Sequence, residues 1–178
     1  IKRANENAKW DNSITKEYIF KRINDWLEKY FGKDHGVTLA FTETDFIEKM
    51  DVMTRAIVYA SYMGTLMENE VEIFTPWTWR EGMYEVVHLF SNYSKEFSVN
   101  DVSSNDSLVS AYTTINKNSD SLTVILVNRS ENATQKVNLN FDNVDFVSQE
   151  YPTLLLSGLT KETFVSKADN ALKKGNVT

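Results

Sequence analysis

A single carboxylate stands at the end of an apolar run early in the chain. Residues 36–46 read GVTLAFTETDF, so Glu43 follows a strand-like segment and lies between Thr42 and Thr44. In barrels and open α/β folds, ligands meet a parallel sheet at the carboxyl ends of its strands. A glutamate at such a strand end is placed for catalysis, and Asp45, two residues later, is a candidate for substrate contact.

Aromatic residues follow the next strand-like segment. Residues 71–80 read VEIFTPWTWR, which places Thr75, Trp77 and Trp79 at the end of that segment. A carboxylate beside aromatic rings suits glycoside hydrolysis, in which the carboxylate attacks or assists at the anomeric carbon while an indole ring stacks on the sugar. We therefore predict that Glu43 is catalytic and that Thr75, Trp77, Trp79 and Asp45 bind the substrate.

Each of these residues also has a purely structural interpretation. A glutamate at a strand end is commonly a solvated loop residue or the partner of a salt bridge. Trp77 and Trp79 could instead pack between two layers of the fold. Glu81, just after the Trp motif, is a further carboxyl group that could act as an acid, but a charge in a loop or at the start of a helix is the favoured interpretation.

Hydrophobic periodicity divides the first 97 residues into helices and strands that alternate. The predicted helices cover residues 14–31, 51–68 and 84–97, and the predicted strands cover residues 37–42 and 71–76. Strands that alternate with helices imply a parallel sheet, as in a doubly wound or barrel fold. The first predicted domain, residues 1–97, is therefore α/β.

The pattern changes at about residue 98, where a polar connector begins. Short strand-like runs then follow, separated by Asn, Asp and Ser, at residues 108–115, 122–128, 136–141 and 146–150. Short strands joined by such turns predict an antiparallel sheet or sandwich. Residues 98–178 are thus predicted to form an incomplete β-sandwich domain, with a polar final stretch to which no element is assigned.

Composition and charge exclude several kinds of partner and site. The 178 residues carry a net charge of −6, which argues against nucleic acid or an anionic membrane as a partner. The chain has no cysteine, so disulfides and thiolate metal sites are excluded, and His35 and His88 show no metal-binding spacing. No run of apolar residues is long enough for a transmembrane helix. We expect neither a metal nor a cofactor.

The segment GVTLAFTETDF, the helix of small residues after it and the segment VEIFTPWTW together resemble a known family. They look like the seventh and eighth strands of a clan-A retaining glycosidase barrel, and are most similar to glycoside hydrolase family 44, the endoglucanases and xyloglucanases. The family's Thr-Glu-Tyr-Asn type motif corresponds here to Thr42, Glu43, Thr44 and Asp45, with Thr44 in place of the aromatic residue. The resemblance covers roughly residues 10 to 150.

This resemblance implies a fold and a function. Residues 1–97 would be the C-terminal sector of a TIM (β/α)8 barrel, followed by a β-sandwich. The chain would be part of a secreted bacterial endo-β-glycanase that hydrolyses β-1,4-linked plant polysaccharide, such as cellulose or xyloglucan. Glu43 would be the nucleophile, and Trp77 and Trp79 would line the sugar subsite. The acid/base glutamate would lie outside this chain, on the missing N-terminal part of the barrel, in the same polypeptide or a complementing chain.

A second class of function remains open at this point. The β-rich region could be a non-catalytic carbohydrate-binding or interaction module, in which the aromatic residues bind a glycan. The placement of the tryptophans argues against this alternative, because residues 98–178 contain none.

Overall fold

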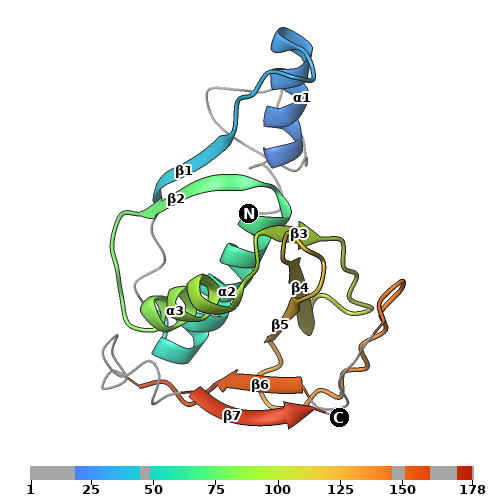
Figure 1. The fold of residues 1–178 in the computed structure, drawn as a ribbon. Helices are drawn as coiled ribbons and strands as arrows, with labels where there is room; N and C mark the ends of the chain where they lie inside the picture. Colours follow the sequence, from blue (N-terminus) through green and yellow to red (C-terminus); the bar gives the residue numbers. More distant parts are fainter. Residues whose placement is uncertain (1–18, 45–48, 146–150, 161–171, 178) are drawn as a thin grey trace. The chain divides into compact units, whose positions relative to one another are not determined.

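The computed structural model describes residues 19–44, 49–145, 151–160 and 172–177. Contacts divide the chain into two compact units, whose elements are labelled in Figure 1. The first unit combines Ile1–Asp45 with Tyr62–Trp77, and the second combines Phe46–Ser61 with Thr78–Thr178. The boundary therefore falls inside one helix, and the predicted domain boundary at residues 97/98 stays a prediction.

The first unit is built on a pair of parallel strands. These are β1 (Leu39–Thr44) and β2 (Val71–Pro76), with Phe41 directly opposite Phe74. The prediction for β2 is confirmed, and a parallel pair is what the alternation of elements indicated. The predicted span 37–42 for β1 is wrong by two residues at each end. Its start is delayed because the Val37 N–H donates to His35 Nδ1 (2.9 Å) and so does not enter the ladder.

Aromatic side chains cover one face of this pair. Phe20 of α1 (Ile19–Phe31) is buried and lies 5.6 Å from Phe41, ring to ring. The Tyr62 ring lies 6.3 Å from that of Phe41 and 5.3 Å from that of Phe74, in edge-to-face geometry with both. The predicted helix 14–31 is confirmed over 19–31, and its first five residues lie outside the described part. This packing fixes which face of the strands is closed.

Helix α2 (Val52–Glu68) begins one residue after Asp51, which caps it. The Thr54 N–H donates to Asp51 Oδ1 (2.9 Å) and the Thr54 hydroxyl donates to Asp51 Oδ2 (2.5 Å). A side chain that satisfies a free N–H of the first turn stabilises the start of a helix. The hydrogen bonds from Thr54, that of its hydroxyl foremost, lower the pKa of Asp51.

This cap predicts an acid-dependent contribution to stability. The pKa of Asp51 is lower in the folded state than the value of about 3.9 expected when unfolded. The contribution of the ionised Asp51 cap to the free energy of unfolding is therefore present above that value. It is lost as pH falls through the folded pKa. Asp51→Ala should therefore lower the melting temperature at pH 6, and its difference from wild type should shrink toward pH 2. A difference independent of pH would contradict this explanation, and Thr54→Val should weaken the pH dependence.

At the start of helix α3 (Met83–Tyr93) the Glu85 side chain accepts a main-chain N–H, and the helix ends earlier than predicted. The Gly82 N–H donates to Glu85 Oε2 (2.8 Å), inside the second unit. The prediction that this helix continues to residue 97 is wrong. Ser94 turns to an extended backbone, and the Lys95 N–H donates to Thr114 Oγ1 (2.9 Å). The chain thus leaves the helix to pair with a strand.

The strand that follows α3 belongs to an antiparallel sheet of order β3-β4-β5. Its members are β3 (Phe97–Val99), β4 (Val109–Ile115) and β5 (Leu122–Asn128). Both longer strands confirm the prediction, β5 fully and β4 to within one residue. The Asn116 side chain closes the hairpin between them by accepting N–H groups from Asp120 and Ser121 (3.1 and 3.0 Å).

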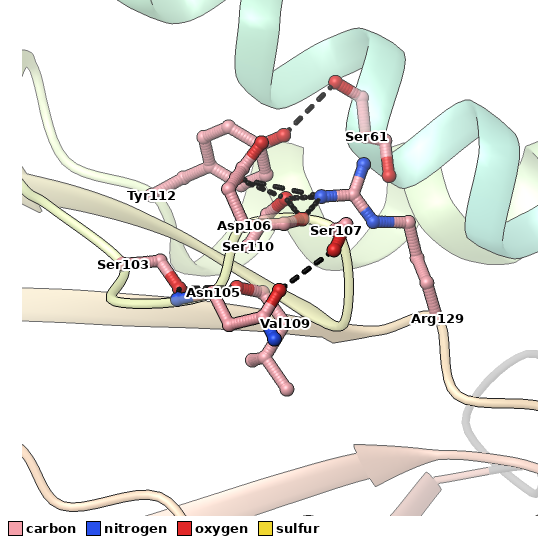
Figure 2. Close-up of polar contacts among 9 residues, drawn as sticks. All are labelled: Ser61, Ser103, Asn105, Asp106, Ser107, Val109, Ser110, Tyr112 and Arg129. Atoms are coloured by element: carbon pink, nitrogen blue, oxygen red, sulfur yellow. Dashed lines mark hydrogen bonds and ion pairs between the residues drawn. The ribbon is translucent and has the colours of Figure 1, made fainter.

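The polar connector before β4 is an ordered loop, which Figure 2 shows in detail. Arg129 donates to the carbonyl of Asp106 and to Ser110 Oγ, and its guanidinium lies 3.4 Å from the Asp106 carboxylate. The buried Ser110 hydroxyl donates in turn to Asp106 Oδ1 (2.7 Å). The Tyr112 hydroxyl donates to the carbonyl of Ser61 on α2 (3.2 Å). The Tyr112 bond joins the sheet to the helical part of the second unit.

The last part of the chain departs most from expectation. Residues 136–141 form no strand, so that prediction is wrong, and Val137 and Leu139 are exposed. Alternation alone predicted a strand there, but no described neighbour pairs with it. The predicted strand 146–150 lies outside the described residues. Instead, β6 (Tyr151–Leu156) pairs antiparallel with β7 (Leu172–Val177). β7 lies in the polar final stretch to which no element was assigned. The sandwich and the barrel both stay predictions.

Within the part of the chain that the structure describes, every helix is too short or too polar to cross a membrane.

Candidate active site

Glu43 occupies a bulge in β1. Thr42 lies opposite Thr75, but the next residue with a partner is Thr44, opposite Pro76. Glu43 is therefore the extra residue, with a φ of 56°, in the left-handed region that side-chain-bearing residues rarely adopt. Among the described residues, the other non-glycine positions with positive φ lie in turns or bends, whereas Glu43 lies within a strand.

The bulge changes which side chains face the open side of the strands. Exposure alternates along β1 up to Thr42, but Glu43 is exposed as well, and Thr44 is again partly covered. In a regular strand Glu43 would share the closed face with Phe41, since successive side chains point to opposite faces. The extra residue lets Thr42 and Glu43 both reach the open side.

β2 presents its polar end on the same open side. Thr75 is exposed between the partly covered Phe74 and Pro76, and Trp77 is 65% exposed. The Trp77 N–H donates to the carbonyl of Thr44 (2.9 Å), which holds the segment after β2 against the end of β1. The structure therefore brings three of the predicted site residues together: Glu43, Thr75 and Trp77. Asp45, also predicted to contact substrate, lies outside the described residues.

Trp79 belongs to the second unit and has a mixed environment. Its ring stacks on Tyr84 at 5.2 Å with an angle of 19°, and meets the edge of buried Tyr59 at 6.5 Å. It nevertheless remains 43% exposed. The packing interpretation thus accounts for part of this side chain, while an exposed portion is available to a ligand.

Glu81, the further carboxyl group considered from the sequence, is paired with a buried cation. Arg55 is 6% exposed and donates to the carbonyls of Glu81 and Met50 (2.9 Å each), and its guanidinium lies 3.5 Å from Glu81 Oε2. Because Arg55 holds Glu81, a structural role explains the Glu81 carboxylate. Arg55 was not predicted from the sequence, although a lone arginine in the apolar run VMTRAIVYA indicated a buried partner.

The described residues contain no group of three or more His, Asp or Glu side chains that could hold a metal ion. His35 accepts from the Val37 N–H, and His88 lies beside the Asn92 amide on α3.

Comparisons of this chain with protein-family models, with curated proteins and with solved structures find no match. Function is therefore inferred from the geometry around Glu43 and from the sequence resemblance.

Proposed function

We propose that this chain is the part of a retaining endo-β-glycanase that carries the nucleophile, Glu43, and acts on β-1,4-linked plant polysaccharide such as cellulose or xyloglucan. One observation supports this most strongly: Glu43 is held in a bulge, with positive φ, at the carboxyl end of a parallel strand. A strained backbone of this kind costs about 1–3 kcal/mol and is concentrated at functional sites.

The neighbouring residues suit the same chemistry. The Glu43 carboxylate would attack the anomeric carbon and form a covalent glycosyl intermediate, which water then hydrolyses. Trp77 is exposed and offers a ring to the apolar face of the attacked sugar, with Thr75 beside it to hydrogen-bond a hydroxyl group. Trp79 and Asp45 are also proposed to contact the substrate.

The acid/base glutamate of this mechanism would lie outside the chain, about 5–5.5 Å from Glu43, as retaining enzymes require. The open side of β1 and β2 supports further strands, because Ile73 is 52% exposed there and parallel sheets are normally covered on both faces. We propose that the N-terminal part of a (β/α)8 barrel, in the same polypeptide or a complementing chain, covers this side. The complete enzyme would be secreted by a bacterium.

Trapping of the intermediate tests this proposal. The complete, assembled protein is incubated with a cellobioside that bears fluorine next to the anomeric carbon and a dinitrophenolate leaving group. We expect a covalent glycosyl adduct on the peptide that contains Glu43, in wild type and in the control variant Glu81→Gln. Retardation on glucan gels without an adduct on Glu43 would instead favour the carbohydrate-binding module.

A further inference from the structure

The loop between β2 and α3 carries Trp79 and is held by a buried arginine of α2. Arg55 is 6% exposed, and its guanidinium donates to the main-chain carbonyls of Glu81 and Met50, each at 2.9 Å. The same guanidinium lies 3.5 Å from Glu81 Oε2. Arginine suits this role because its planar fork fixes several donors at once. Arg55 therefore holds the main chain two residues after Trp79.

A glycine next to Glu81 brings the loop close to the start of α2. A Cβ atom at Gly82 would lie 2.5 Å from the carbonyl oxygen of Val52, in the first turn of this helix. Arg55, further along α2, binds the neighbouring residue Glu81. Close packing at Gly82 and the bonds of Arg55 thus restrain adjacent residues of the loop.

The Trp79 ring packs on one tyrosine from each of the two helices. It stacks on Tyr84, in the first turn of α3, with 5.2 Å between the ring centroids and 19° between the ring planes. It lies 6.5 Å from the ring of fully buried Tyr59 on α2, at an angle of 71°. Aromatic rings attract one another in both of these arrangements. Because Trp79 is still 43% exposed, its ring is packed against the protein and open to a ligand at the same time.

We propose that Arg55 is a positioning residue for substrate binding: it holds the loop so that Trp79 keeps its stack on Tyr84 and presents the exposed part of its ring to the glycan. This inference rests on the proposed function, in which Trp79 contacts the substrate. All of these residues belong to the second unit. A loop without this hold would leave the ring in several orientations, and affinity falls in proportion to the fraction that can bind.

Arg55→Met tests the inference, since methionine fills part of the space of the arginine stem but cannot bond to the two carbonyls. In the complete enzyme, assayed on carboxymethylcellulose and on xyloglucan, we expect KM to rise roughly 2- to 10-fold, the worth of one aromatic contact. The value of kcat should change by less than about twofold, because a ring that only binds the sugar holds ground state and transition state equally. In a Trp79→Ala background, Arg55→Met should raise KM no further.

Near-UV circular dichroism reports on the Trp79 ring independently of activity. Aromatic side chains contribute to this signal while their tertiary packing is fixed, and the contribution is lost with the packing. The difference between the spectra of wild type and Trp79→Phe defines the contribution of this ring. Arg55→Met should lose most of it. Arg55→Lys should do the same, because a compact ammonium group lacks the planar fork that binds both carbonyls.

Two variants are matched controls. Glu81→Gln removes the ion pair but keeps the carbonyl that accepts from Arg55, so KM and the dichroism should stay close to those of wild type. Tyr112→Phe removes a buried hydroxyl that donates to the carbonyl of Ser61 on α2, elsewhere in the second unit. It should lower the melting temperature and leave KM unchanged.

Unchanged dichroism in the Arg55 variants would overturn the inference, as would increases in KM that are additive in the double variant. Changed dichroism with unchanged KM, in an enzyme labelled at Glu43, would also overturn it, because Arg55 would then order a ring that does not bind substrate. Failure of the proposed function is distinct: wild type would carry no label at Glu43. If Arg55→Met does not fold, Arg55→Lys decides.

Discussion

Glu43→Gln in the complete enzyme should lower kcat by a factor on the order of 10⁴ to 10⁶, the range seen when one member of a catalytic set is removed. The amide has the shape of the carboxylate but cannot form the glycosyl ester, so binding of the polysaccharide should persist. Steady-state kinetics and a binding isotherm on the same preparation measure the two effects. Retained turnover would exclude Glu43 as the nucleophile.

Glu43→Gly gives a sharper version of the same test. Glycine adopts positive φ without strain, so we expect this variant to be inactive yet at least as stable to urea as Glu43→Gln, which keeps φ near 56°. Added azide can take the place of the missing carboxylate, and it should restore turnover of a substrate with a good leaving group, with a glycosyl azide as the product. A Gly variant that is less stable than the Gln variant would mean that the bulge is not strained.

Gly82→Ala should be the most destabilising single-methyl change in the second unit. Gly82 has a φ of 88°, and a Cβ atom at this position would lie 2.5 Å from the carbonyl oxygen of Val52, at the start of α2. The left-handed backbone costs about 1–2 kcal/mol for a residue with a side chain, and overpacking typically adds about 1–3 kcal/mol. We expect the free energy of unfolding in urea to fall by about 3 kcal/mol.

Gly32→Ala measures the cost of the left-handed backbone without the cost of overpacking. Gly32, directly after α1, has a nearly equal φ of 84°, but a Cβ there would meet nothing within 4 Å. Its substitution should cost only the backbone term, about 1 kcal/mol. Equal losses at the two positions would show that α2 and the start of α3 move apart easily, contrary to the close contact in the structure.

The parts of this fold that repeat a simple period could be predicted from the sequence. Helical spacing predicted α2 to within one residue, and the apolar run VEIFTP predicted β2. The end of α3 could not be predicted in this way, because residues 94–97 are compatible with a helix. It is the Lys95 N–H, donating to Thr114 nineteen residues later, that draws the chain into β3.

The candidate site, like the fold, could be predicted from the sequence only in part. The sequence predicted a glutamate at a strand end with Thr75 and Trp77 nearby, and these three residues lie on one side of the strands. It could not predict the bulge, since an extra residue in β1 is defined only by the register against β2. Nor could periodicity show that the Glu81 carboxylate is held by Arg55, twenty-six residues earlier.

The segment Trp77–Arg80 is anchored at both ends through the main chain. The Trp77 N–H bonds to the Thr44 carbonyl before it, and the Glu81 carbonyl accepts from Arg55 after it. Any replacement within these four positions other than proline at 77 leaves both bonds in place, because main-chain atoms make them. For the proposed enzyme, side chains at these four positions would therefore be free to adapt to a new glycan while the main-chain bonds at either end are kept.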